Sequence, residues 1–182
     1  MIYIIRHGKT QWNEMHKLQG RTDIPLNESG REMAKEAAKL YKDVHFDLCY
    51  TSPLKRARET AALLLEGRNI PIIPDDRLME MSFGESEGIE NSFDTPELPI
   101  NVLFHKPEEY VAGPGGESLD ELYERTGSFL KEVAYPLHEE GKSVLIVGHG
   151  AMNCSIVSQV KNIPRSEYWN CGIENCKLKQ LV

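Results

Sequence analysis

Arg6, His7 and Gly8 follow a short apolar run, Ile2–Ile5, at the start of the chain. The planar guanidinium group of arginine matches the oxygens of a phosphate, and glycine allows a bulky anion to approach the backbone. Histidine titrates near neutral pH and can act as a nucleophile. The triplet therefore indicates phosphate chemistry on a histidine. An isolated histidine at a strand end more often bonds a backbone carbonyl, so the hypothesis depends on the rest of the chain.

Other residues of this kind follow later apolar runs. Arg56 comes shortly after Thr51-Ser52, His149 stands between two glycines, and Glu80 follows Arg77-Leu78-Met79. In open α/β sheets, ligands bind beyond the carboxyl ends of the strands, and helix N-termini there favour an anion. If the strands are neighbours, two histidines and two or three arginines share one crevice.

Strand and helix signals alternate along the chain. Strands are predicted at residues 2–6, 46–50, 70–73 (near a sheet edge, because it contains Pro71), 143–147 and 176–181. Helices are predicted from Asn27 as N-cap to Lys42, from Ser52-Pro53 to about Glu66, from Glu117 to about Leu137, and over 151–160. The alternation predicts an α/β fold, a three-layer sandwich whose mostly parallel central sheet has helices on both faces.

Length and composition predict a single domain over residues 1–182. The net charge of −7 argues against a nucleic-acid or acidic-membrane partner. No run is long enough for a transmembrane helix, and the apolar start is too short for a signal peptide. The four cysteines form no CxxC pair, so we expect reduced thiols, no zinc site and a cytoplasmic protein.

The segment from about residue 88 to 116 interrupts this alternation. Four prolines within it break any long element: Pro96, Pro99, Pro107 and Pro114. We expect an insertion over the sheet edge and the active site, where loops carry specificity more often than stability.

The ordered set of motifs resembles the histidine phosphatase superfamily, also called phosphoglycerate mutase-like. The resemblance covers nearly the whole chain and rests on segments 6–13 (RHGKTQWN), Gln19-Gly20 with 23–27 and Gly30, 52–61 (SPLKRARETA), 80–88, 115–118 and 148–150. Any one of these is a weak signal, whereas six in the right order are a strong one.

The resemblance implies the role of each residue. His7 is the nucleophile that forms a phosphohistidine, and Arg6, Arg56 and His149 surround the phosphoryl group. Glu80 protonates the leaving group and then deprotonates the attacking water, although Glu85 and Glu87 lie nearby in the sequence. Asn13, Gln19, Gly20 and Gly150 are expected to bind substrate. Neither a metal nor a cofactor is expected, and the protein is expected to be a monomer or a homodimer that takes a small phosphorylated substrate.

Two activities within this family compete. A mutase returns the phosphoryl group to another hydroxyl, whereas a phosphatase gives it to water. The short chain, the form of the second motif and the acidic segment 89–110, with a single lysine, favour the phosphatase. The layout resembles α-ribazole phosphatases and broad-specificity sugar-phosphate phosphatases, but Ser86 stands where an aromatic residue is typical.

A reading from another functional class is a non-catalytic module that binds phosphate or a phosphopeptide. The presence of every catalytic position argues against it.

Overall fold

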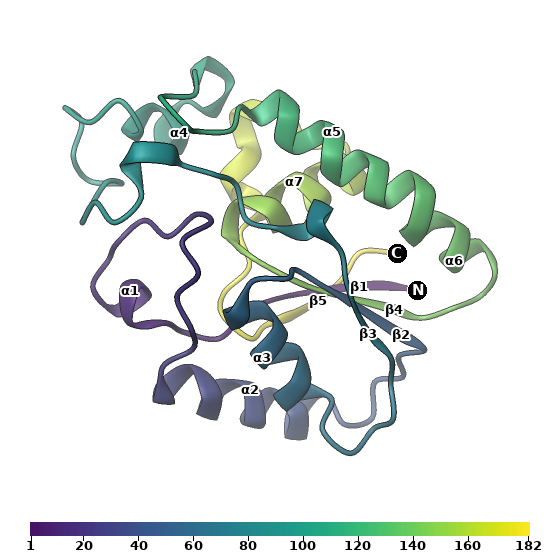
Figure 1. The fold of residues 1–182 in the computed structure, drawn as a ribbon. Helices are drawn as coiled ribbons and strands as arrows, with labels where there is room; N and C mark the ends of the chain where they lie inside the picture. The colour runs from purple at the N-terminus through teal and green to yellow at the C-terminus, as the bar shows by residue number, and fades with distance from the viewer.

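The computed structural model describes residues 1–182 and contains one five-stranded sheet (Figure 1). The strands run in the order β3-β2-β4-β1-β5, with bounds Ile2–Arg6 for β1, Leu48–Thr51 for β2, Ile72–Pro74 for β3, Val144–Gly148 for β4 and Leu178–Gln180 for β5. All neighbours pair in parallel except β5, which is antiparallel to β1. The predicted mostly parallel α/β sheet is confirmed, with β3 at an edge.

Helices cover both faces of the sheet (Figure 1). Helices α2 (Glu28–Leu40) and α3 (Lys55–Leu64) pack on one face, and α5 (Leu119–Phe129), α6 (Tyr135–Glu139) and α7 (Gly150–Lys161) lie on the other. Successive strand residues pack on opposite faces of the sheet. Ile4 belongs to the larger buried cluster and Ile5 to the smaller one. The central strands therefore need apolar side chains on both faces, which explains the continuous apolar runs.

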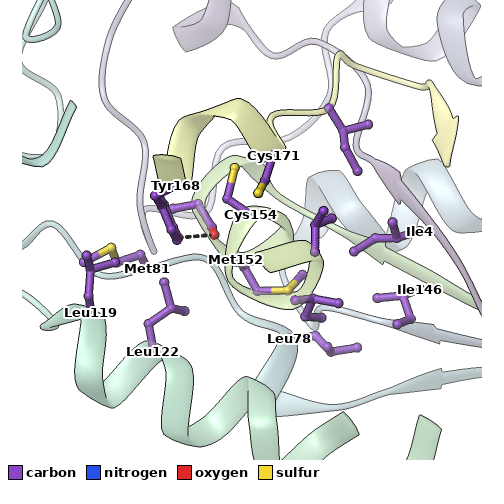
Figure 2. Packing of buried hydrophobic residues seen from close by; sticks show 14 of the residues in the cluster. Ile4, Leu78, Met81, Leu119, Leu122, Ile146, Met152, Cys154, Tyr168 and Cys171 are labelled. Atoms are coloured by element: carbon purple, nitrogen blue, oxygen red, sulfur yellow. Dashed lines mark hydrogen bonds between the residues drawn. The ribbon is translucent and has the colours of Figure 1, made fainter. Parts of the chain in front are cut away.

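The larger cluster lies between the sheet and the α5–α7 layer. Figure 2 shows Ile4 and Ile146 of the sheet on one side, Met152 and Cys154 of α7 in the middle, and Leu122 of α5 beyond them. The Tyr168 hydroxyl donates to the carbonyl of Ala151 at the start of α7. The packing thus fixes the N-terminus of α7, next to which the predicted site residues lie.

The predicted start of α3 at Ser52 is wrong. The helix begins at Lys55, and its N-cap, Leu54, has no side-chain cap. Instead, the Asp23 carboxylate accepts a hydrogen bond of 2.8 Å from the Lys55 N–H. Ser52 Oγ accepts only a 3.3 Å bond from Leu54 N–H. The Asp23 carboxylate, from a loop distant in sequence, therefore caps the N-terminus of α3 in place of the expected serine.

The long helix predicted from Glu117 is divided. Ser118 forms a capping box with Glu121, so the helix begins at Leu119. Residues Leu130–Ala134 form a π-helical stretch before α6. Pro136 at the start of α6 lacks an N–H and crowds the preceding turn, which accounts for the widened backbone there. In contrast, Asn27 caps α2 as predicted, its side chain accepting from Gly30 N–H.

The segment 88–116 contains only short elements, α4 (Asn101–His105) and a 3₁₀ turn at Pro107–Glu109. The remaining short elements are α1 (Gln11–Glu14) and 3₁₀ turns at Asp76–Leu78, Gly84–Ser86 and Arg165–Cys171. No helix has both the length and the apolar character needed to cross a membrane.

Candidate active site

The two histidines meet because β1 and β4 are adjacent and parallel. Arg6 pairs with Gly148 in the register of the two strands, so His7 and His149 both leave the sheet at its carboxyl edge. Their ring centroids lie 5.2 Å apart. The sequence could not show strand order. The observed order makes β1 and β4 neighbours, as a crevice shared by the two histidines requires.

His7 is held as a neutral imidazole with one ring nitrogen free. Its Nδ1 lies 2.6 Å from the carbonyl oxygen of Gly8, and since a carbonyl only accepts, Nδ1 must carry the proton. Burial, followed by the guanidinium groups of Arg56 and Arg6, lowers the pKa of His7 well below its ordinary value. Nε2 therefore keeps its lone pair at neutral pH. The carbonyl bond that a structural histidine would make is present, and it orients the ring as a nucleophile requires.

Buried donors without partners gather around His7. The Nε atoms of Arg6 and Arg56 and both ring nitrogens of His149 have no hydrogen-bond partner. The other guanidinium nitrogens of Arg56 donate to the carbonyls of Gly20 (2.6 Å) and Thr22 (3.0 Å) rather than to a carboxylate. Unsatisfied buried donors are costly. An anion with several oxygens would satisfy them together.

The charge of this group is positive at neutral pH. Burial lowers the pKa of Arg56 to about 10, which leaves it protonated. Burial lowers the pKa of Arg6 as well, and the Glu80 carboxylate opposes that change. Burial, Arg56 and His7 lower the pKa of His149 well below its ordinary value. Two cations and two neutral imidazoles thus give this pocket a local positive charge on an acidic protein.

Glu80 reaches the same place from the segment after β3. Its Oε1 accepts from the backbone N–H groups of Met81 (2.8 Å) and Met152 (2.9 Å), and its Oε2 accepts from that of Ala151 (3.1 Å). The carboxyl group therefore lies on the N-terminus of α7, beside His149. Oε2 accepts only one of the three bonds and has the greater capacity left for proton transfer.

A cavity of about 410 Å³ opens above these groups. All but one of the predicted site residues line it: Arg6, His7, Asn13, Gln19, Gly20, Arg56, Glu80 and Gly150. His149 is fully buried against His7 and does not line the cavity wall.

Asn13 and Gln19 line this cavity, and their amide oxygens are used within the protein. Asn13 Oδ1 accepts from the Thr10 N–H as part of a capping box, and Gln19 Oε1 accepts from the Thr10 hydroxyl at 2.8 Å. With the oxygens occupied, the NH₂ groups are the ends available to a phosphate oxygen.

The comparison with protein families settles the relationship. The family model described as the histidine phosphatase superfamily (branch 1) matches residues 2–182. The chain belongs to this superfamily. The resemblance of the motifs is thereby confirmed.

Relatives of the chain include both phosphatases and mutases. It is 37% identical over 161 residues to the uncharacterized phosphatase PhoE of Bacillus subtilis, covering 87% of this chain and 76% of that protein. It is 33% identical over 153 residues to a 2,3-bisphosphoglycerate-dependent phosphoglycerate mutase of Cytophaga hutchinsonii, covering 82% and 72%.

Among solved structures, Bacillus stearothermophilus YhfR superposes with a TM-score of 0.85 at 31% identity, over 97% of this chain and 88% of that one. α-Ribazole phosphatases also share the fold. The superfamily thus accounts for the fold, and its members similar to this chain are named both as phosphatases and as mutases.

The expectation that Gly8 allows a bulky anion to approach the backbone is wrong. A Cβ atom at this position would lie 2.4 Å from the carbonyl oxygen of Gly30. The Gly8 N–H donates to the Thr60 hydroxyl. The missing side chain therefore allows two backbone segments to touch, and does not make room for an anion.

The nearby carboxylates differ sharply in what they contact. Glu87 accepts from the backbone N–H groups of Arg21, Thr22 and Phe83 and from the Thr22 hydroxyl. Glu85 is exposed. Glu80 is thus the only one of the three that lines the cavity.

Two sets of residues near the site were not found from the sequence. The first comprises three aromatic residues that line the outer cavity, Phe93, Phe104 and Trp169. The second is the Glu117–Arg125 ion pair behind Glu80. The aromatic content of segment 88–116 was a usable signal, whereas the ion pair spans a turn and a helix and has no local signature. No group of three or more histidine, cysteine, aspartate or glutamate side chains is placed to hold a metal ion.

Proposed function

We propose that this protein is a metal-independent phosphatase that hydrolyses small phosphomonoesters through a phosphohistidine on His7. The observation that carries the proposal is the Nδ1–Gly8 bond, which leaves Nε2 unprotonated beside the unpartnered nitrogens of Arg6 and Arg56. A nucleophile and a set of anion donors share one cavity, and phosphoryl transfer needs both.

In the first step, His7 Nε2 attacks phosphorus. The N–P bond forms as the P–O bond to the alcohol breaks, and a proton on Glu80 passes to the departing oxygen. Arg6, Arg56 and His149 donate to the phosphoryl oxygens, and because they are already fixed by packing, little reorganisation is required. In the second step, water attacks phosphorus and gives its proton to Glu80. The N–P bond breaks, and inorganic phosphate leaves.

Charge in the outer cavity favours hydrolysis over mutase activity. A mutase must hold a second phosphate near the first. Lys17 lines the cavity, but it lies 3.5 Å from the Glu90 carboxylate, and Glu174 lines the same cavity. The acidic character of segment 89–110 therefore reduces the attraction for a bisphosphate. α-Ribazole phosphate and sugar phosphates are candidate substrates.

The mutase remains the alternative, because His16 and Lys17 both face the outer cavity. A non-catalytic phosphate-binding module is a further alternative.

Turnover of p-nitrophenyl phosphate in the presence of EDTA tests the proposal. We expect turnover that EDTA leaves unchanged and that His7→Ala abolishes. His45→Ala is the matched control, because His45 is exposed and lines a different cavity. Rapid quenching should trap a phosphoryl group that is stable to base and labile to acid.

Two results would favour one of the alternatives over the proposed phosphatase. Absence of turnover from pH 5 to 8, together with phosphate binding, supports the binding module. Conversion of 3-phosphoglycerate to its isomer, dependent on trace bisphosphoglycerate, supports the mutase.

A further inference from the structure

The outer half of the cavity has an aromatic wall. The ring centroids of Phe93 and Phe104 lie 4.0 Å apart with their planes tilted by 37°, and those of Phe104 and Trp169 lie 5.4 Å apart with a tilt of 42°. All three line the cavity that contains His7. Because the inner half holds the cationic groups, the cavity has a polar end for phosphate and an apolar end for whatever is esterified to it.

Hydrogen bonds fix this wall in place. The Trp169 indole donates to the carbonyl of Leu103 at 2.6 Å. The Asn101 amide donates to the carbonyl of Phe93 at 2.7 Å, and His105 Nε2 donates to the same oxygen at 2.8 Å. Two segments distant in sequence are thereby joined, so the rings are arranged before any ligand arrives.

The wall leaves apolar surface exposed to solvent. Phe93 is 46% exposed although its neighbour Phe104 is partly buried against the core. A ring placed over Phe93 would remove this surface from water and gain an aromatic contact. Nothing within the chain covers it.

The charges around the wall do not favour a second anion. Lys17, which lines the cavity, lies 3.5 Å from the Glu90 carboxylate and packs over the Trp12 ring. Glu174 adds a carboxylate to the lining. A leaving group with its own carboxylate or phosphate therefore finds little uncompensated positive charge.

We propose that the aromatic wall of Phe93, Phe104 and Trp169 selects phosphomonoesters whose alcohol carries a planar apolar ring. This rests on the proposed phosphatase function and adds the substrate class to it. The ring stacks on Phe93 and Phe104 while the phosphoryl group occupies the site between His7, Arg6 and Arg56.

Two alkyl phosphates of similar intrinsic reactivity test the proposal, 2-phenylethyl phosphate and glycerol 3-phosphate. Both release a primary alkoxide, so their ratio of kcat/KM reports recognition rather than leaving-group chemistry. We expect the wild type to favour the phenyl compound by about tenfold or more, the range that aromatic contact and apolar burial support. 3-Phosphoglycerate, with its extra carboxylate, should be the poorest of the three.

Substitution of the wall should reduce the preference. Phe93→Ala is the first variant, because its exposed ring is not needed for the core, and Phe104→Leu is the second. Each should lower the ratio by about threefold to tenfold. Val111→Ala is the matched control, since Val111 lies in the same segment, is 84% exposed and does not line the cavity.

The outcomes separate the two proposals. Equal kcat/KM for the two esters, or a ratio that Phe93→Ala leaves unchanged, overturns the aromatic subsite while the phosphatase stands. Absence of His7-dependent turnover with either ester overturns both. Unchanged thermal unfolding of Phe93→Ala shows that a lower ratio does not reflect misfolding.

Discussion

Buried Glu117 and partly buried Arg125 form a two-point ion pair, with Nε–Oε1 at 2.6 Å and a second guanidinium nitrogen at 2.9 Å from Oε2. The same guanidinium group donates to the carbonyls of Arg77 (2.6 Å) and Glu80 (3.2 Å). Arg125 thus holds the backbone of the proposed acid, while α7 holds its carboxyl group. We infer that Arg125 positions Glu80 without touching the substrate.

Substitution of Arg125 by methionine should therefore slow proton transfer. We expect kcat for an alkyl phosphate to fall by about tenfold to a hundredfold, with a smaller change in KM. This loss is a part of the rate acceleration that general acid catalysis usually supplies. The loss should be smaller with p-nitrophenyl phosphate, whose leaving group needs less protonation. A purely structural defect would affect both substrates equally.

Stability must be measured alongside. Loss of one partner of a fully buried pair costs about 3–5 kcal/mol. We expect a smaller loss here, because Arg125 is partly exposed and Glu117 also lies 3.6 Å from Arg21. Arg125→Lys serves as the milder variant. Arg165→Met is the matched control, because the Arg165–Asp120 pair is on the surface and such pairs contribute about 0–1 kcal/mol. Equal loss of activity on both substrates would contradict a positioning role.

Glu87 is predicted to act on substrate affinity rather than on chemistry. Its carboxylate ties the loop containing Gln19 and Gly20 to the segment after Glu80. Glu87→Gln turns an acceptor-only group into one with a donor end, so part of this set of bonds is lost. We expect a higher KM with a smaller change in kcat. Glu85→Gln, an exposed neighbour, should change neither, and an unaltered KM in Glu87→Gln would show that the loop is held by other contacts.

Gly8 and Gly113 form a matched pair for a test of backbone contact. A Cβ at Gly8 meets the Gly30 carbonyl at 2.4 Å, whereas at Gly113 nothing lies within 4 Å. Gly8→Ala should lower the free energy of unfolding by about 1–3 kcal/mol, as overpacking does. Gly113→Ala should be neutral or slightly stabilising. Urea denaturation of the two variants measures both effects, and similar values for the two would contradict the proposed contact.

Much of the fold could be predicted because its signals are local. The run Ile2–Arg6 and the asparagine cap of α2 depend on neighbours in sequence, and both are found where predicted. The start of α3 could not be predicted, because Asp23 supplies the bond to Lys55 from 32 residues away. The π-helical turn after Phe129 likewise reflects packing and Pro136 together.

The site divides in the same way. His7, Arg56 and His149 are recognisable because their types and motifs stand out in the chain. The aromatic wall is not, since Phe104 and Trp169 meet only after two segments far apart in sequence are brought together. Arg125 is a further case: a guanidinium group that bonds main-chain carbonyls leaves no pattern in the residues it holds.

The buried histidines predict how stability depends on pH. Burial, with the charges of Arg56 and Arg6, lowers the pKa of His7 and His149 in the folded protein. In the unfolded chain a histidine titrates near about 6.5. Below that pH the unfolded state takes up protons that the folded state does not. The stabilisation is therefore complete above about pH 6.5 and is lost as the pH falls toward the folded-state pKa values.

Each of these two histidines should contribute a slope of about 1.4 kcal/mol per pH unit within that window. Urea denaturation at pH 7.5, 6.5 and 5.5, in a buffer free of phosphate, measures it. His149→Gln should reduce the slope by the share of one histidine, whereas His45→Gln should leave it unchanged because His45 is exposed. Added inorganic phosphate should flatten the wild-type dependence, since a bound anion stabilises the imidazolium of His149 and so lets the folded state take up a proton too. Equal slopes for wild type and His149→Gln would mean that His149 is not held neutral in the folded protein.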